Sequence, residues 1–117
     1  MTDPKRRKEL LAEAAAHPPD AGVYRITNTA TGRSLLASAI NLASTRNRFE
    51  FTQSTNAVNG LDPRLVADAK AHGIEHLTYE VLDVLEVSPD ASADEVRDDL
   101  RTLEGLWRDR LDPSTLY

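Results

Sequence analysis

The apolar residues of this 117-residue chain gather in short stretches separated by polar segments, and three of these stretches predict β-strands. Residues 22–28 and 34–38 contain strand-forming apolar residues, and the polar segment 28–32 between them supplies turn-forming residues. Together they predict a β-hairpin. Residues 77–85 alternate between apolar and polar positions with one slip at Val81-Leu82, which indicates either a central strand or a β-bulge.

Helices are predicted in four longer segments, which are 3–16, 41–51, 62–72 and 93–111. The third has clear signals at both ends, because Asp62-Pro63 suits a helix start and Gly73 suits a helix end. The fourth carries an apolar stripe at helical spacing, formed by Val96, Leu100, Leu103, Trp107 and Leu111. The polar segment 52–60 has no such pattern and is predicted to be a loop.

The order of these elements, α-β-β-α-α-β-α, predicts an α+β fold with a small three-stranded antiparallel sheet flanked by helices. A chain of 117 residues has the usual length of one domain, so residues 1–117 are expected to form a single unit. Within it, residues 1–19 form the predicted N-terminal helix and its Pro18-Pro19 exit, and residues 20–117 form the core.

Composition narrows the class of protein. The hydrophobic content of 40% suffices for one compact core, and the sequence holds no apolar run long enough to cross a membrane. There is no cysteine, hence no disulfide framework and no thiolate metal site. The basic residues 5–8 are followed by an apolar stretch that Glu13 interrupts, so no signal peptide is predicted. These features favour a bacterial cytoplasmic protein.

The charge balance bears on possible partners. The net charge is −5 and the isoelectric point is about 5.1, so the chain as a whole does not attract phosphate backbones, which bind through Lys and Arg. Two local basic patches remain, at residues 5–8 and at Arg46 and Arg48.

An ordered set of short motifs runs through the sequence. The motifs are Gly22-Val23-Tyr24, Leu35-Leu36-Ala37, Ser38 followed by Asn41-Leu42, residues 74–82, residues 98–107 and Leu111-Asp112-Pro113. In this order they resemble the GIY-YIG nuclease family, in particular its small bacterial single-domain subgroup. The first half of the family signature is present at Gly22-Val23-Tyr24, whereas Leu35-Leu36-Ala37 stands where the second half has Tyr-Ile-Gly or Phe-Ile-Gly. The motif is therefore degenerate.

The resemblance implies a nuclease site that cuts a nucleic-acid phosphodiester with the help of Mg²⁺ or Mn²⁺. In the active family, the residue at Tyr24 activates water, an Arg on the next helix stabilises the developing phosphate charge, and the residue at Glu104 holds the metal. Counted from Asn41, the family Arg falls near Thr45, so the candidates here are Arg46 or Arg48. Those two residues and Arg33 are the expected contacts to DNA.

Several family positions are changed. Leu35 replaces the second tyrosine with a side chain that neither donates, accepts nor titrates, and the family's final Asn has no counterpart. The sequence therefore predicts an eroded site in a non-catalytic or weakly active module that binds nucleic acid or protein. One alternative is an active metal-dependent endonuclease that uses Tyr24, Arg46 or Arg48, and Glu104. Another is a structural or regulatory protein-interaction domain that works through its last helix.

The surroundings of Glu104 separate these alternatives. Helical spacing puts this residue at the edge of the apolar stripe, where it binds a metal, extends to solvent or pairs with Arg108 one turn later. A positively charged cleft that joins Tyr24, Arg46 and Glu104 would favour nucleic acid. An acidic cleft, or one filled by Leu35 or by a paired Arg108, would favour a protein partner.

Overall fold

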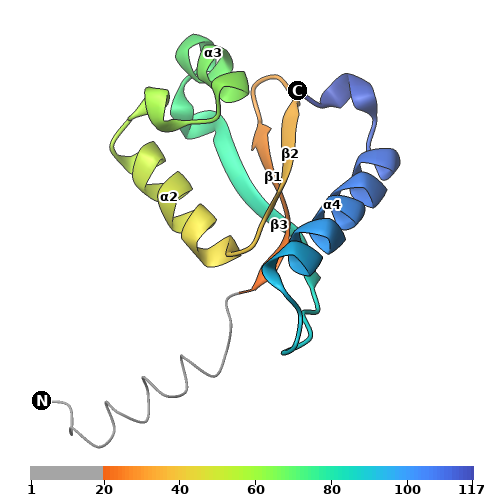
Figure 1. Ribbon diagram of the computed structural model, residues 1–117. Coiled ribbons are helices and arrows are strands. Elements are labelled where there is room, and N and C mark those ends of the chain that lie inside the picture. Colours follow the sequence, from red (N-terminus) through yellow and green to blue (C-terminus); the bar gives the residue numbers. More distant parts are fainter. Residues whose placement is uncertain (1–19) are drawn as a thin grey trace, which may run out of the picture.

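A computed structural model describes residues 20–117 and has an α+β fold built on a three-stranded antiparallel sheet (Figure 1). The strands are β1 (Ala21–Asn28), β2 (Ser34–Ala39) and β3 (Leu77–Leu85), and the α-helices are α2 (Leu42–Ser54), α3 (Pro63–His72) and α4 (Ala93–Arg110). Short 3-10 helices are η1 (Val58–Gly60), η2 (Ile74–His76) and η3 (Pro113–Thr115). The predicted α+β fold and antiparallel sheet are confirmed. The helix predicted at 3–16 lies outside the described residues.

The strand order in the sheet is β2-β1-β3, so β1 is central and pairs antiparallel with both neighbours. Along β3 the register slips, because Val23 pairs with Asp83 whereas Tyr24 pairs with Val81. Leu82 is therefore the extra residue of a β-bulge. The bulge predicted at this point is confirmed, and the alternative of a central strand is wrong because β3 lies at an edge.

Helices cover both faces of the sheet. Helices α2 and α3 lie on one side and α4 lies on the other, where it packs on β1 and β2 (Figure 1). The main core cluster fills the space beneath α2 and α3, and its buried members are Ile26, Leu35, Phe49, Leu65, Ala69, Ile74 and Leu77. On the opposite face, the indole N–H of Trp107 donates a hydrogen bond of 3.0 Å to Asp83.

Helix α2 starts as predicted and ends later than predicted. The Asn41 side chain accepts a hydrogen bond of 3.0 Å from the Ser44 amide and caps the helix. The helix then runs to Ser54, so the predicted loop at 52–60 is wrong over its first three residues, and Val58–Gly60 forms a 3-10 turn. The longer helix has a tertiary cause, because the Gln53 side chain donates hydrogen bonds to the carbonyl oxygens of Ile74 and Leu77.

Helix α3 matches its sequence signals. The Asp62 side chain accepts from the Arg64 amide at 2.9 Å, Pro63 occupies the first turn, and Gly73 ends the helix with a φ of 96°. Helix α4 begins after Ser92, whose hydroxyl accepts from the Glu95 amide at 3.2 Å. None of the helices described is both long and apolar enough to cross a membrane.

Candidate functional site

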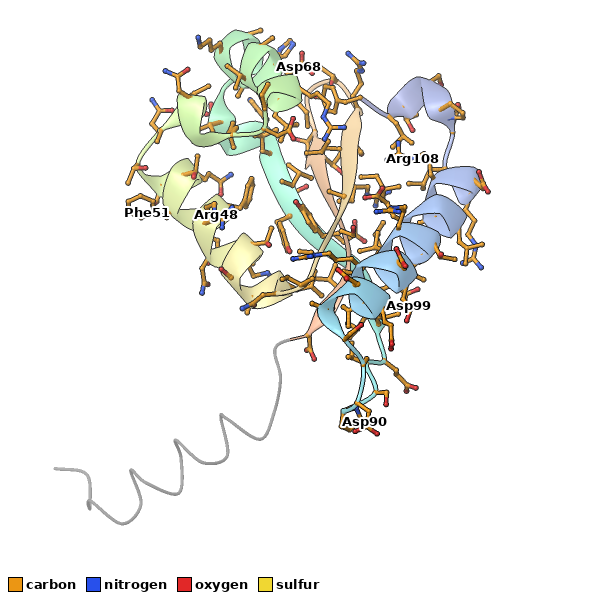
Figure 2. The ribbon with its side chains drawn as sticks, in the orientation of Figure 1. Arg48, Phe51, Asp68, Asp90, Asp99 and Arg108 are labelled. Atoms are coloured by element: carbon orange, nitrogen blue, oxygen red, sulfur yellow. The ribbon has the colours of Figure 1, made fainter. Side chains whose placement is uncertain are left out.

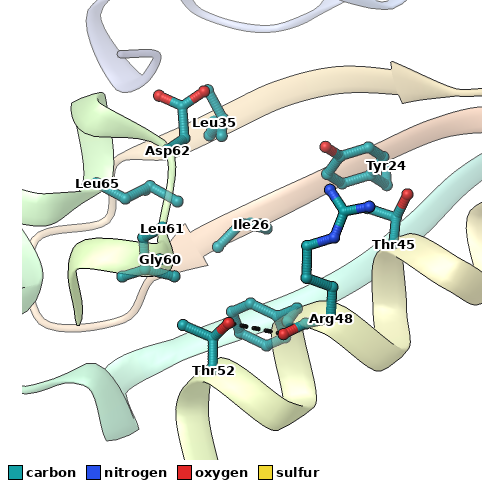
Figure 3. A pocket seen from close by; sticks show the side chains of 11 residues that line it. Tyr24, Ile26, Leu35, Thr45, Arg48, Thr52, Gly60, Leu61, Asp62 and Leu65 are labelled. Atoms are coloured by element: carbon teal, nitrogen blue, oxygen red, sulfur yellow. Dashed lines mark hydrogen bonds between the residues drawn. The ribbon is translucent and has the colours of Figure 1, made fainter. Parts of the chain in front are cut away.

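A pocket of about 320 Å³ opens between the sheet and the helices α2 and α3 (Figure 3). Its lining consists of Tyr24, Ile26, Leu35, Thr45, Arg48, Phe49, Thr52, Gly60, Leu61, Asp62 and Leu65. The polar groups of Tyr24, Thr45 and Arg48 lie together at one end, and Leu61 and Leu65 lie toward the other (Figure 3). One end of the pocket is therefore polar, and the other end combines the two leucines with the Asp62 carboxylate beside them.

Tyr24 projects from the central strand into this pocket, and its ring is held by a second aromatic side chain. It stacks on Tyr79 of β3, with the ring centroids 5.1 Å apart and an interplanar angle of 19°. Burial raises the pKa of the Tyr24 hydroxyl, and the negative charge of Asp62 raises it further, whereas the charge of Arg48 opposes the rise. At neutral pH the Tyr24 hydroxyl is therefore protonated and serves as a hydrogen-bond donor or acceptor.

Arg48 and Arg46 lie on the same helix and point to different places. Arg48 lines the pocket together with Thr45, which is three residues earlier and so shares its helix face. Figure 3 shows the guanidinium of Arg48 beside Tyr24. The Arg46 guanidinium instead lies 5.2 Å from the centre of the Tyr79 ring, and Arg46 lines a separate pocket with Val81. The two residues differ by about 200° around the helix, and only Arg48 lines the Tyr24 pocket.

Leu35 forms part of the apolar wall of the pocket. It pairs with Ile26 across the β1–β2 ladder, and its exposed fraction is 2%. It also belongs to the main core cluster with Ile26 and Phe49. The position that the GIY-YIG resemblance assigns to a second tyrosine is thus occupied by a buried hydrocarbon side chain, and the pocket has no hydroxyl there.

Glu104 lies on α4 and does not line the pocket. Its carboxylate is 3.6 Å from the guanidinium of Arg108, the partner expected one turn later. Arg108 lies on the opposite side of the sheet from Arg48 (Figure 2). The charge of Glu104 still reaches the Tyr24 hydroxyl, where it makes a smaller contribution to the raised pKa than Asp62 does.

Each acidic side chain near Tyr24 has an arginine beside it. One Glu104 oxygen lies 3.6 Å from the Arg108 guanidinium, which is too far for a hydrogen bond. Both oxygens of Asp62 accept hydrogen bonds from the Arg64 side chain, at 3.0 and 3.1 Å. Over residues 20–117, no three His, Cys, Asp or Glu side chains gather in a way that would hold a metal ion, so no group of ligands marks the Mg²⁺ or Mn²⁺ site that the family resemblance implies.

Two charged residues of the site, Asp62 and Arg64, were not expected from the sequence. The Arg64 hydrogen bonds lower the pKa of Asp62, and the same partnership raises the pKa of Arg64. The sequence does indicate that Asp62 starts a helix. What it does not show is that the start of α3 faces Tyr24, because that depends on how η1 and α3 pack on the sheet.

Arg33, the remaining expected contact to DNA, lies away from this pocket. Its guanidinium is 4.6 Å from the centre of the Tyr117 ring. Tyr117 in turn donates a backbone hydrogen bond of 3.0 Å to the Ser34 carbonyl and a short side-chain hydrogen bond to Asp68. Arg33 therefore packs against the C-terminal segment and does not line the Tyr24 pocket.

Comparisons of the chain with models of protein families, with curated proteins and with solved structures found no significant match. We therefore infer the function of this protein from the geometry and charge of the Tyr24 pocket.

Proposed function

We propose that this chain is a GIY-YIG-like domain that has lost its catalytic chemistry and acts as a protein-binding module through the Tyr24 pocket. The observation that carries the proposal is the wall of this pocket. Leu35 places a buried apolar side chain where the family has its second tyrosine, while an open space of about 320 Å³ remains beside it. A retained pocket with an apolar wall favours binding over phosphodiester hydrolysis.

The state of Tyr24 supports the loss of chemistry. A general base works best when its pKa lies near the working pH. Tyrosine already ionises at about pH 10, and burial raises the pKa of Tyr24 above that value. Asp62 adds to this effect because its negative charge disfavours a phenolate nearby. Tyr24 is therefore poorly suited to take a proton from water at neutral pH.

The charges around the pocket support a protein partner over nucleic acid. Its lining carries one cation, Arg48, and one anion, Asp62, so it is not a positively charged cleft. Glu104 lies 3.6 Å from Arg108 and does not line the pocket, so neither residue changes the charge of the lining. The net charge of the whole chain, −5, also opposes binding to a phosphate backbone.

An active endonuclease is the second candidate, and one observation favours it. The charges of Arg48 and Glu104 both act on the Tyr24 hydroxyl, although these residues come from α2 and α4. Two of the residues that the resemblance assigns to the site are thus in electrostatic reach of a third, Tyr24. In this reading, Tyr24 and Arg48 would hold the substrate phosphate and Glu104 would need to leave Arg108.

Cleavage assays decide between the two candidates. Supercoiled plasmid and branched DNA are incubated with Mg²⁺ or Mn²⁺ and the wild-type chain, Tyr24→Phe or Glu104→Ala. We expect no nicking by the wild type above that of the two variants. Nicking that disappears in both variants would contradict the proposal and make the endonuclease the leading candidate. A parallel titration with DNA at low salt is expected to show no salt-dependent binding.

A further inference from the structure

The two ends of the Tyr24 pocket differ in chemistry. At the polar end are the Tyr24 hydroxyl, the Thr45 hydroxyl and the Arg48 guanidinium (Figure 3). At the other end are Leu61, Leu65 and the Asp62 carboxylate. Both oxygens of Asp62 are engaged by Arg64, so what this end offers a ligand is the hydrocarbon of the two leucines. A ligand that matches both ends has a polar head and an apolar body, since polar groups buried without partners are costly.

Arg48 determines the sign of the charge on the polar head. Ion pairs among residues 20–117 involve other arginines, namely Arg25, Arg64, Arg97, Arg101 and Arg108. Arg48 makes none of them, and it is an exposed residue at the pocket. A guanidinium offers a planar fork of N–H donors that fits a carboxylate through two parallel hydrogen bonds. The polar end therefore suits an anion.

Asp62 limits how much negative charge the pocket accepts. It contributes the one carboxylate of the lining, and Arg64 engages both of its oxygens. Asp62 is therefore not free to bind a cationic ligand. Because Arg64 neutralises Asp62, a ligand with one negative charge would balance Arg48, whereas a second negative charge would find no further cation in the lining. A single carboxylate fits this balance better than a phosphate dianion.

We propose that the Tyr24 pocket binds an apolar group that carries one carboxylate, with the carboxylate at Arg48 and the apolar body toward Leu61 and Leu65. This inference rests on the proposed function, because it assigns a ligand class to the same pocket. Two sources supply such a group, namely a small free carboxylic acid and the C-terminal residue of a partner polypeptide. The pocket volume of about 320 Å³ suits either one, since ligand sites begin at about 300 Å³.

Titrations followed by ¹H–¹⁵N NMR test the inference on the full chain. The probes are sodium hexanoate and its uncharged counterpart hexanamide. We expect hexanoate to bind saturably and to shift the backbone signals of Thr45, Arg48 and Leu61. Hexanamide is expected to bind about tenfold more weakly or worse, because a charge-assisted hydrogen bond contributes more than a neutral one.

Arginine variants on the same helix provide the matched comparison. Arg48→Met keeps an unbranched apolar stem and removes the guanidinium with its charge, and we expect it to weaken hexanoate binding about tenfold or more. Arg46→Met makes the same change two residues earlier, at a side chain that lies over Tyr79, and is expected to leave hexanoate binding unchanged. Equal losses in the two variants would overturn the inference, because they would indicate a nonspecific charge effect.

A variant at the end of the pocket near Leu61 tests separately whether the hydrocarbon part of the ligand lies there. A Cβ atom at Gly60 would lie 3.6 Å from Thr52, an ordinary contact, so the backbone there accepts the first atom of a side chain. Gly60→Leu narrows the pocket without changing any charge, and we expect it to weaken hexanoate binding. Urea denaturation of the same variant checks that it is folded. Unchanged binding in this variant would show that the hydrocarbon chain lies elsewhere and would overturn the inference.

The same titrations distinguish the sources and the competing anion. A short peptide ending in leucine with a free carboxylate is compared with its amide, and selective binding of the free acid supports the inference with a polypeptide as the source. Tighter binding of hexanoate than of this peptide supports it with a small acid as the source, and would overturn the proposed binding of a protein at this pocket. Tighter binding of inorganic phosphate than of hexanoate would overturn it. Absence of hexanoate binding together with absence of DNA cleavage would overturn this inference alone, whereas cleavage would overturn the proposed function.

Discussion

The rings of Tyr24 and Tyr79 stack across the β1–β3 ladder, with their centroids 5.1 Å apart. The bulge in β3 determines the register at this point, because Tyr24 is the first residue of β1 after the slip. Tyr79 also contacts Phe49 of α2 at a centroid distance of 5.9 Å, and its hydroxyl donates to the Leu42 carbonyl at 3.3 Å. Tyr79 thus connects the candidate site residue to the helix that carries Arg48.

Replacement of Tyr79 tests this connection. Tyr79→Leu removes the ring stack and the hydrogen bond to α2, so we expect the free energy of unfolding to fall by about 1–3 kcal/mol. Tyr79→Phe keeps the ring and is expected to cost less than about 1 kcal/mol, because the lost hydrogen bond is long. Urea denaturation measures both values. Equal losses in the two variants would show that the hydroxyl, and not the stack, provides the stabilisation.

A second prediction concerns the alkaline stability of the fold. Burial and the Asp62 charge raise the pKa of Tyr24 in the folded state above that of the unfolded chain. In the pH range between these two values, the unfolded chain has lost the proton and the folded chain keeps it. The contribution of Tyr24 to the free energy of unfolding is therefore unchanged below the unfolded pKa. It falls as the pH rises from about 10 toward the folded pKa.

Urea denaturation at a series of alkaline pH values measures this fall. The pKa values of Tyr79 and Tyr117 are also raised by burial, so the wild-type slope contains all three tyrosines. Tyr24→Phe is expected to make the slope shallower without removing it. A slope that is the same in the wild type and in Tyr24→Phe would mean that Tyr24 ionises normally, and the main argument against its role as a base would fail.

The elements of the fold were largely predictable, and the exception has a tertiary cause. The cap at Asn41, the Asp62-Pro63 start and the β3 bulge all leave local signals in the sequence. The last turn of α2 has no such local signal, because the contacts that stabilise it come from residues far away in the sequence. The Gln53 amide donates to the carbonyl oxygens of Ile74 and Leu77, at 3.1 and 2.8 Å, and these partners lie more than twenty residues away.

The candidate site was less predictable. Sequence counting from Asn41 left Arg46 and Arg48 as equal candidates, and helix geometry then separates them by face. Asp62 and Arg64 were missed because local sequence does not reveal which surface the start of α3 faces. The pairing of Glu104 with Arg108 follows from their helical spacing and was one of the alternatives expected for Glu104.

The start of α3 allows a third prediction. Asp62 accepts a hydrogen bond from the Arg64 amide and caps the helix, so Asp62→Ala is expected to lower the free energy of unfolding by about 0.5–2 kcal/mol. Asp62→Asn keeps a capping oxygen and is expected to cost less. The Arg64 hydrogen bonds lower the pKa of Asp62 in the folded state. The stabilisation from the charged form is therefore present above the unfolded pKa of about 4 and is lost as the pH falls through the folded pKa.

Chemical denaturation at neutral pH and at acidic pH checks this prediction. The difference between the wild type and Asp62→Asn is expected to shrink as the pH falls, because the charge that distinguishes them is neutralised. The side chains of Asp62 and Arg64 are 33% and 50% exposed, so solvent screens the pair and the shrinking part is small. A difference that grows at acidic pH would contradict the assigned partnership with Arg64.

Leu35 occupies the position where the GIY-YIG family has an aromatic ring, and the last prediction concerns restoring that ring. Leu35→Tyr places a larger side chain at a position that is 2% exposed, so we expect a loss of stability of about 1–3 kcal/mol from overpacking. We expect no DNA cleavage with Mg²⁺ or Mn²⁺, because Thr45 still stands near the family Arg position and Glu104 remains paired with Arg108. Leu35→Phe is the matched control, since it adds the ring without the hydroxyl. Plasmid nicking by either variant would contradict this expectation, because residues that act as a unit in catalysis lose activity together and one restored ring should not recover it. Nicking by Leu35→Tyr alone would show that the hydroxyl is needed, and nicking by both would show that the ring suffices.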